Sequence, residues 1–189
     1  MGVAGRIAPA VNQAPEPYLS VVIPVFNEAE SLPELGRRLL ATLEAWGRPF
    51  EVIFVDDGST DGSWEILTEL HQRRPDQVRA IQFLRNFGQH QAIFAGFQVV
   101  RGQVVVTLDA DLQNLPEDIP KLVAKLEEGY DTVGGWRENR LDSWLRRLPS
   151  YFMNLTMSWV TGVKLRDYGC MLRAYRREVV DGINQCRES

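Results

Sequence analysis

Three polar side chains follow a strongly apolar stretch in the second half of the sequence. Residues 104–108 read VVVTL, and Asp109, Asp111 and Gln113 come directly after them. Two carboxylates close together in an apolar setting are costly unless a cation lies between them. Side chains at i and i+2 of an extended chain point the same way, so the two carboxylates can face one point, which Gln113 reaches as the chain turns. Their oxygens suit Mg²⁺ or Mn²⁺, which can also bind a diphosphate. The alternative is a solvated loop whose acidic residues cap a helix.

A second acidic segment, DDGSTDGS, occupies residues 56–63 and also follows an apolar run. A carboxylate there can accept hydrogen bonds from a nucleobase N–H or from a ribose hydroxyl. The alternative is turn chemistry, in which Gly58 and Asp61 supply the turn and the start of a helix. The segment is therefore a candidate nucleotide contact, with a purely structural role as its competitor.

The elements around these segments alternate between strands and helices. Ser31 and Glu34 form a capping-box pattern at the start of the first helix. Strands are predicted at 19–26, 50–55, 78–84, 103–108 and 130–136, and helices at 32–46, 63–74, 88–100 and 116–128. This alternation predicts an α/β fold with a largely parallel sheet flanked by helices. Ligands of such sheets bind beyond the carboxyl ends of the strands, so PVFNE, DDGSTDGS and DADLQ are expected to converge there.

Length and composition favour one soluble domain. The chain has 189 residues, enough for one sizeable core. We expect a flexible tail over residues 1–17 and a single domain over residues 18–189. No apolar run reaches the roughly 18 residues that a spanning helix needs. The two cysteines, Cys170 and Cys186, predict no disulfide framework and fit a reducing cytoplasm.

Charge is unevenly distributed along the chain. The net charge is −4, and residues 136–189 contribute +4 to it, which leaves −8 for residues 1–135. A basic C-terminal third suggests an anionic partner such as a phosphate or a lipid surface, with solvated helix faces as the alternative. Residues 141–163 carry an apolar stripe at helical spacing that includes Trp144 and Trp159 beside Arg146 and Arg147. It fits core packing or a helix on a membrane surface.

Other enzyme classes fit poorly. The first strand is followed by PVFNEAE rather than by the G-x-G-x-x-G of dinucleotide-binding enzymes. An aspartyl-phosphate phosphatase would place its acidic pair after the first strand, whereas this pair follows the fourth. Of the two histidines, His71 is expected on a helix surface, and His90, beside the loop after the third strand, is a candidate substrate contact.

Four segments in a fixed order carry a family resemblance: SVVIPVFNEAESLPEL, VDDGSTDGS, RNFGQHQAIFAGF and TLDADLQNLPEDIPKLV. They resemble inverting glycosyltransferases of family 2, which have the GT-A (nucleotide-diphospho-sugar transferase) fold, and the resemblance covers about residues 19–187. Within this family the chain is most similar to polyprenyl-phosphate glycosyltransferases. The segments RNFGQH, RLDSW and DYGCMLRAYRR resemble the branch of undecaprenyl-phosphate 4-deoxy-4-formamido-L-arabinose transferases.

The resemblance implies metal-assisted transfer of 4-deoxy-4-formamido-L-arabinose from a UDP-sugar to undecaprenyl phosphate, in lipid A modification. It implies a membrane surface as a partner, at the cytoplasmic face of the inner membrane, and no nucleic acid; it predicts no oligomeric state. The alternatives are a polyprenyl-phosphate glucosyl- or mannosyltransferase, and a domain that holds a nucleotide without transferring a sugar. Members of this branch continue past the position of Ser189 through two transmembrane helices of about 20 residues each, so the chain is expected to be a catalytic domain cut before them.

The resemblance also assigns roles to residues. The nucleotide site would comprise Pro24, Phe26, Glu28, Asp56, Asp57 and Asp109. The metal, Mg²⁺ or Mn²⁺, would be held by Asp109, Asp111 and Gln113, with Asp111 also counted as catalytic. Arg137 and Arg140 would contact phosphates, since a planar guanidinium suits that task. Asp167 falls where the family places a candidate base. A lipid phosphate has a second pKa of about 6, so its oxygen is already anionic, and Asp167 could orient the acceptor or steady arginines instead.

Overall fold

The structure, a computed structural model, describes residues 16–135 and 171–188. These residues form a six-stranded sheet in the order β3-β2-β1-β4-β6-β5. The strands are β1 Leu19–Val25, β2 Phe50–Asp56, β3 Val78–Gln82, β4 Val104–Thr107, β5 Thr132–Gly134 and β6 Arg173–Arg176. The helices are α1 Leu32–Trp46, α2 Ser63–Arg73, α3 Gln89–Phe97, α4 Ile119–Glu127 and α6 Arg177–Glu188, with a 3₁₀ turn at Pro116–Asp118.

The sheet is largely parallel, which confirms the predicted fold class. β1 pairs in parallel with β2 and β4, and β2 pairs in parallel with β3. The exception is β6, an antiparallel strand between β4 and β5 that was not predicted from the sequence. Its Ala174 lies opposite Val106 and Val133 and is fully buried. A strand from the C-terminal part of the chain therefore completes the sheet.

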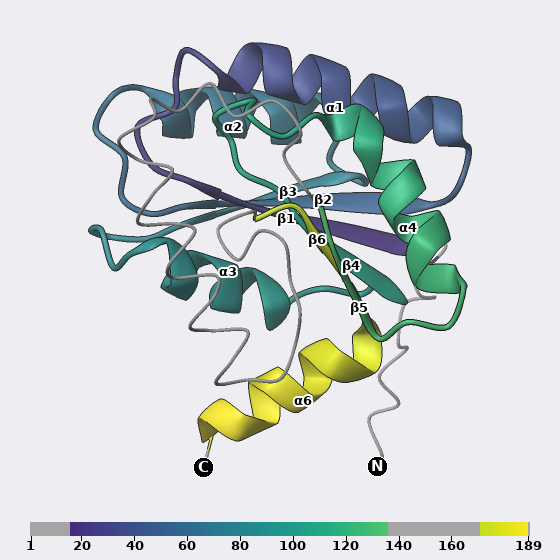
Figure 1. Ribbon diagram of the computed structural model, residues 1–189. Helices are drawn as coiled ribbons and strands as arrows, with labels where there is room; N and C mark the ends of the chain where they lie inside the picture. Colours follow the sequence, from purple (N-terminus) through teal and green to yellow (C-terminus); the bar gives the residue numbers. More distant parts are fainter. Residues whose placement is uncertain (1–15, 136–170, 189) are drawn as a thin grey trace, which may run out of the picture.

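Helices cover both faces of the sheet (Figure 1). Alternate residues of β1 and β2 point to opposite faces, as the period of a strand requires. Val21, Ile23 and Phe54 pack with apolar residues of α1, α2 and α4, and Val22 and Ile53 pack with those of α3 and α6. Both faces of the central strands are therefore buried, which explains why β1 and β2 are buried along their whole length.

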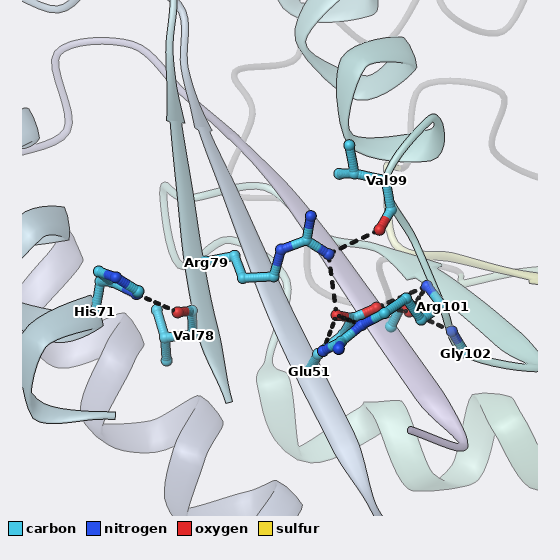
Figure 2. Close-up of polar contacts among 8 residues, drawn as sticks. Glu51, His71, Val78, Arg79, Val99, Arg101 and Gly102 are labelled. Atoms are coloured by element: carbon cyan, nitrogen blue, oxygen red, sulfur yellow. Dashed lines mark hydrogen bonds and ion pairs between the residues drawn. The ribbon is translucent and has the colours of Figure 1, made fainter. Parts of the chain in front are cut away.

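One charged side chain lies inside this structure at the amino ends of the strands. Glu51 of β2 is 0% exposed and accepts hydrogen bonds from the Ser20 hydroxyl and from the Arg101 backbone N–H, both at 2.7 Å. The guanidinium groups of Arg101 and Arg79 lie 2.8 and 3.3 Å from its second oxygen (Figure 2). The cluster joins β1, β2, β3 and the connection before β4.

His71 lies exposed on α2, as predicted, and its ring also contacts the sheet. Its Nδ1 lies 2.7 Å from the backbone carbonyl oxygen of Val78, so it links α2 to β3 (Figure 2). A carbonyl only accepts, so Nδ1 carries the proton.

Within residues 16–135 and 171–188, every helix falls short of the length and apolarity that crossing a bilayer demands.

Candidate active site

A cavity of about 260 Å³ opens at the carboxyl ends of β1, β2 and β4. The loops that follow these strands supply about half of its wall, and the end of β1, the loop after β3 and the first residue of α3 supply the rest. Its lining residues are Pro24, Val25, Phe26, Glu28, Asp57, Asn86, Gly88, Gln89, Asp109, Ala110 and Asp111. The predicted convergence of the three loops is therefore confirmed.

The loop after β1 is fixed to the loop after β2 by hydrogen bonds. Asn27 has a φ of +56°, and its backbone N–H donates to the Ser59 hydroxyl while its side-chain oxygen accepts from the Thr60 N–H. The Ala29 N–H donates to the carboxylate of Asp61 at 3.0 Å. Burial raises the pKa of Asp61, but hydrogen bonds from Ser63, Ala29 and its own backbone more than offset this, so its pKa lies below the ordinary value. An ionised Asp61 therefore holds the two loops together.

Glu28 is held at the cavity wall by a different arrangement from the predicted capping box. The Ser31 hydroxyl donates to the Glu28 carboxylate at 2.6 Å and to its carbonyl oxygen, and it makes no bond to a helix N–H. Glu34 pairs with Arg37 instead of returning to Ser31. The capping-box prediction is wrong because Ser31 already has helical backbone angles, which place its hydroxyl toward the preceding loop.

Asp57 reaches into the loop after β3. It is 2% exposed, and its two carboxylate oxygens accept the backbone N–H groups of Phe87 and Gly88 at 2.7 and 2.8 Å. Asp57 also lines the cavity, so it supports the wall as well as facing the space inside. Asp56, by contrast, is fully buried, accepts the Ser59 N–H at 3.1 Å, and does not belong to the lining.

The first carboxylate of the DAD segment is fixed between two amide side chains. Asp109 accepts a hydrogen bond from Gln89 Nε2 at 2.8 Å on one oxygen and from Asn114 Nδ2 at 3.3 Å on the other. Gln89 belongs to α3, so this contact joins the walls that follow β3 and β4. Asn114 is only 5% exposed, so it contacts Asp109 from the interior of the protein. The orientation of Asp109 is thus set before any ligand arrives.

The second carboxylate lies in a turn rather than in extended chain. Asp111 is exposed, its Oδ1 accepts the Gln113 N–H at 3.0 Å, and Leu112 between them has a φ of +60°. The expectation of an extended 109–111 segment is therefore wrong, although Asp109 and Asp111 still line one cavity. Gln113 is exposed and lies outside the lining.

The donor atoms fit a hard divalent cation. The two aspartates offer only oxygen ligands, which Mg²⁺ and Mn²⁺ prefer. In the part of the chain that the structure describes, no group of three or more His, Cys, Asp or Glu side chains gathers to hold a metal. Two protein carboxylates suit an ion that takes its remaining ligands from water and from a substrate diphosphate, as Mg²⁺ commonly does.

Several sequence-based candidates lie outside the described residues. They are Arg137, Arg140, Asp167 and the apolar stripe of residues 141–163, together with the expected tail up to residue 15. Conversely, the lining residues Asn86, Gly88 and Gln89 were not among the candidates predicted from the sequence. The segment RNFGQH follows a strand like the three chosen segments, so the same rule could have found them. His90, held as a substrate contact, is exposed and is not part of the lining.

Gly58 allows the loops after β2 and β3 to approach closely. Its φ is +75°, and a methyl group at this position would lie 2.5 Å from the carbonyl carbon of Arg85. We expect Gly58→Ala to lower the free energy of unfolding by at least about 2 kcal/mol. Alanine is strained at this positive φ, and the backbone of Arg85 must also move to make room for the methyl group. Gly47→Ala is the matched control, since Gly47 has a φ of +76° with nothing within 4 Å of the added methyl. Urea denaturation measures both, and equal losses would contradict a close contact at Gly58.

Comparison with known proteins agrees with this arrangement. A family model described as glycosyl transferase family 2 matches residues 20–183. Among solved structures, the mannosyltransferase PcManGT from Pyrobaculum calidifontis, in complex with GDP-Man and Mn²⁺, superposes with a TM-score of 0.62 at 22% identity. That match covers 92% of this chain and 48% of the other.

Two further structures show the same fold. Glucosyl-3-phosphoglycerate synthase from M. tuberculosis matches with a TM-score of 0.67 at 20% identity, over 86% of this chain and 58% of the other. TarS 1–349 from S. aureus in complex with UDP-GlcNAc matches with a TM-score of 0.57 at 21% identity, over 88% and 47% of the two chains. This chain therefore spans about half the length of the structures it matches.

Proposed function

The chain belongs to glycosyl transferase family 2, and from this premise we propose that it transfers a sugar from a UDP-sugar to a polyprenyl phosphate with the help of Mg²⁺ or Mn²⁺. One observation carries the proposal: Asp109 and Asp111 line the same cavity as Pro24, Phe26 and Asp57. The two carboxylates that could bind a metal ion and its diphosphate thus lie beside a cavity wall that suits a nucleoside.

The cavity wall offers complementary contacts to a nucleoside. Phe26 is 45% exposed, so its ring is available to a flat base, and Pro24 offers a second apolar surface. Asp57 and Glu28 present carboxylate oxygens that can accept hydrogen bonds from base N–H or ribose hydroxyl groups. Asp56 then acts by holding the turn, rather than through ligand contact.

Asp109 and Asp111 are proposed to hold the metal and the donor diphosphate, with Gln113 as a further candidate ligand. When bound, the divalent cation would neutralise the negative charge that develops on the departing nucleoside diphosphate. The chain's own task is to keep the carboxylates in place, which Gln89 and Asn114 do for Asp109. Such preorganisation stabilises a transition state without reorganisation during the reaction.

The proposed reaction is a single displacement with inversion. An anionic oxygen of the acceptor phosphate forms a bond to the anomeric carbon, and the bond from that carbon to the UDP oxygen breaks, so UDP leaves with the electron pair. Because the acceptor oxygen is already anionic near neutral pH, no protein base has to remove a proton. Asp167 then orients the acceptor, and Arg137 and Arg140 bind phosphate groups; these three assignments rest on the sequence resemblance.

The acceptor and the sugar are proposed from the same resemblance. Its C-terminal segments favour undecaprenyl phosphate as acceptor and 4-deoxy-4-formamido-L-arabinose as sugar, in lipid A modification at the cytoplasmic face of the inner membrane. Glucose and mannose are the competing sugars. UDP is preferred over GDP as the donor nucleotide on the same ground, while structures of the same fold bind GDP-Man, UDP and UDP-GlcNAc.

Titration with nucleotides tests the donor site. UDP is expected to bind at least about tenfold more tightly with Mn²⁺ than with EDTA, because the cation offsets repulsion between the diphosphate and the two aspartates. GDP is expected to bind more weakly than UDP under the same conditions. Calorimetry measures all three affinities. Equal UDP affinity with Mn²⁺ and with EDTA would contradict the proposal, and transfer to a short-chain polyprenyl phosphate then compares the three sugar donors.

A further inference from the structure

Exposed apolar side chains gather at the cavity end of the sheet. In residues 16–135 and 171–188, five large hydrophobic residues are strongly exposed. Four of them lie in the loops after β1, β3 and β4: Phe26, Leu84, Phe87 and Leu115. The fifth, Tyr130, precedes β5 at the other end of the sheet. Within these residues the other large hydrophobic side chains are half-buried or buried, and Phe26 itself lines the cavity, so most of the strongly exposed apolar side chains lie at the cavity end of the sheet.

Two of these residues belong to one short segment, the 84–87 tip, which consists of Leu84, Arg85, Asn86 and Phe87. Leu84 is fully exposed at 103% and Phe87 is 51% exposed. The Arg85 guanidinium lies 4.7 Å from the centre of the Phe87 ring, and Arg85 forms no ion pair within the described part of the chain. The tip thus presents two apolar side chains and one unneutralised cation to solvent.

The tip is held in place by the body of the protein. Asp57 binds the N–H groups of Phe87 and Gly88, and the Phe83 ring packs edge-on against Phe87 with centres 5.6 Å apart. Gly58 lies against the backbone of Arg85 from below. This anchoring holds the tip in a conformation in which the Leu84 side chain is fully exposed.

The tip also borders the cavity directly. Asn86 belongs both to the tip and to the lining, and Gly88 and Gln89 continue the wall. Whatever surface the tip contacts will therefore lie beside the cavity mouth. A reactant that is bound to that surface could therefore place its phosphate in the cavity while it remains at the surface.

We propose that the 84–87 tip contacts the anionic surface of a lipid bilayer, with Leu84 and Phe87 entering the headgroup region and Arg85 pairing with lipid phosphates. The inference rests on the proposed function, in which the acceptor's polyprenyl chain keeps its phosphate at the membrane surface. The cavity mouth must then approach that surface closely. Aromatic, aliphatic and arginine side chains together are the combination that membrane interfaces favour.

Vesicle sedimentation tests the tip. The full 189-residue chain is incubated with unilamellar vesicles of phosphatidylcholine and phosphatidylglycerol, and with phosphatidylcholine alone. Leu84→Ser is expected to lower the partition coefficient at least about fivefold, because an inserted leucine side chain is lost. Tyr130→Ser, which removes an exposed ring of 50% exposure at the other end of the sheet, is the matched control and should bind like wild type. Arg85→Ala should weaken binding only to the anionic vesicles.

Three outcomes overturn the inference. They are vesicle binding by Leu84→Ser within twofold of both wild type and Tyr130→Ser, no binding by any of these proteins, and a wild-type dimer that Leu84→Ser converts to a monomer. The last outcome would assign the tip to a second copy of the chain. UDP affinity and transfer to a water-soluble short-chain acceptor are measured in parallel and should be unchanged in Leu84→Ser. If they are absent in all variants while partitioning still depends on Leu84, the proposed function fails and the membrane contact stands.

Discussion

Asp111→Ala is expected to lower sugar transfer by at least about a thousandfold and to reduce UDP affinity in Mn²⁺ to the value measured in EDTA. The reason is electrostatic: the variant loses one of the two carboxylates at the cavity that can hold a cation against the diphosphate. Without that charge balance, the remaining acidic wall repels the donor. The measurement is a pair of UDP titrations, with Mn²⁺ and with EDTA, followed by a transfer assay.

Asp111 is a cleaner test position than Asp109. Its carboxylate is exposed, and among the described residues it holds only the local turn, through the Gln113 N–H. Asp109 is also bound by Gln89 and Asn114, so its replacement would disturb the walls after β3 and β4 together. Removing Asp111 should therefore leave the free energy of unfolding nearly unchanged, and a loss of binding would report on the site itself.

Asp131→Asn serves as the control for charge. Its side chain is 83% exposed, and it precedes β5, away from the cavity. This variant removes the same unit charge, so a general effect of net charge on nucleotide affinity would show in both proteins. If Asp111→Ala retained the full enhancement by Mn²⁺, the metal would have to be held elsewhere and the proposed role of Asp111 would be wrong.

The fold could be predicted from the sequence as far as local pattern determines it. The runs LSVVIPV and FEVIFVD are apolar apart from Ser20, Glu51 and Asp56, as expected of strands that are covered on both faces. Their alternation with helical segments is the pattern from which a parallel sheet was predicted. β6 could not be predicted in the same way. Its sequence RAYR has no run of β-branched residues, and its place in the sheet depends on pairing with β4 across more than 60 residues of the chain.

The candidate site was predicted from one topological rule, and its details depend on long-range contacts. The rule that ligands lie beyond the carboxyl ends of parallel strands placed Asp57, Asp109 and Asp111 together. Nothing local to Asp57 shows that it binds the N–H groups of Phe87 and Gly88, thirty residues away. The turn at Leu112 is equally hidden, because a φ of +60° is uncommon for a leucine.

Glu51→Gln is expected to lower the free energy of unfolding by about 2–3 kcal/mol at pH 7, which corresponds to a decrease in Tm of roughly 5–10 °C. Glu51 occupies a buried strand position that sequence patterns assign to apolar residues. Every group that faces its carboxylate is a donor: the Ser20 hydroxyl, the Arg101 N–H and the two guanidinium groups. One carboxylate oxygen faces the Ser20 hydroxyl and the Arg101 N–H, and the other faces the two guanidinium groups (Figure 2). A glutamine has an NH₂ group in place of one of these oxygens, so this donor would face other donors.

The same cluster makes stability depend on pH. Burial raises the pKa of Glu51, but the hydrogen bonds from Ser20 and Arg101 outweigh it and hold the pKa below the ordinary value. A group whose pKa is lower in the folded state contributes stability above its unfolded pKa, near 4.3, and loses it as the pH falls through the folded pKa. The difference between wild type and Glu51→Gln should therefore be constant from pH 8 to about pH 5 and shrink at lower pH.

Urea denaturation at several pH values measures both effects, with Glu69→Gln as the control. Glu69 pairs with Arg73 on the surface of α2 and is 66% exposed, so its replacement should leave the urea midpoint unchanged. Because the Glu51 cluster lies at the amino ends of the strands, UDP affinity should survive in Glu51→Gln under native conditions. If Glu51→Gln were as stable as wild type, a charged carboxylate would be no more favourable at this position than a neutral amide. If the folded variant lost UDP binding, the two ends of the sheet would be coupled.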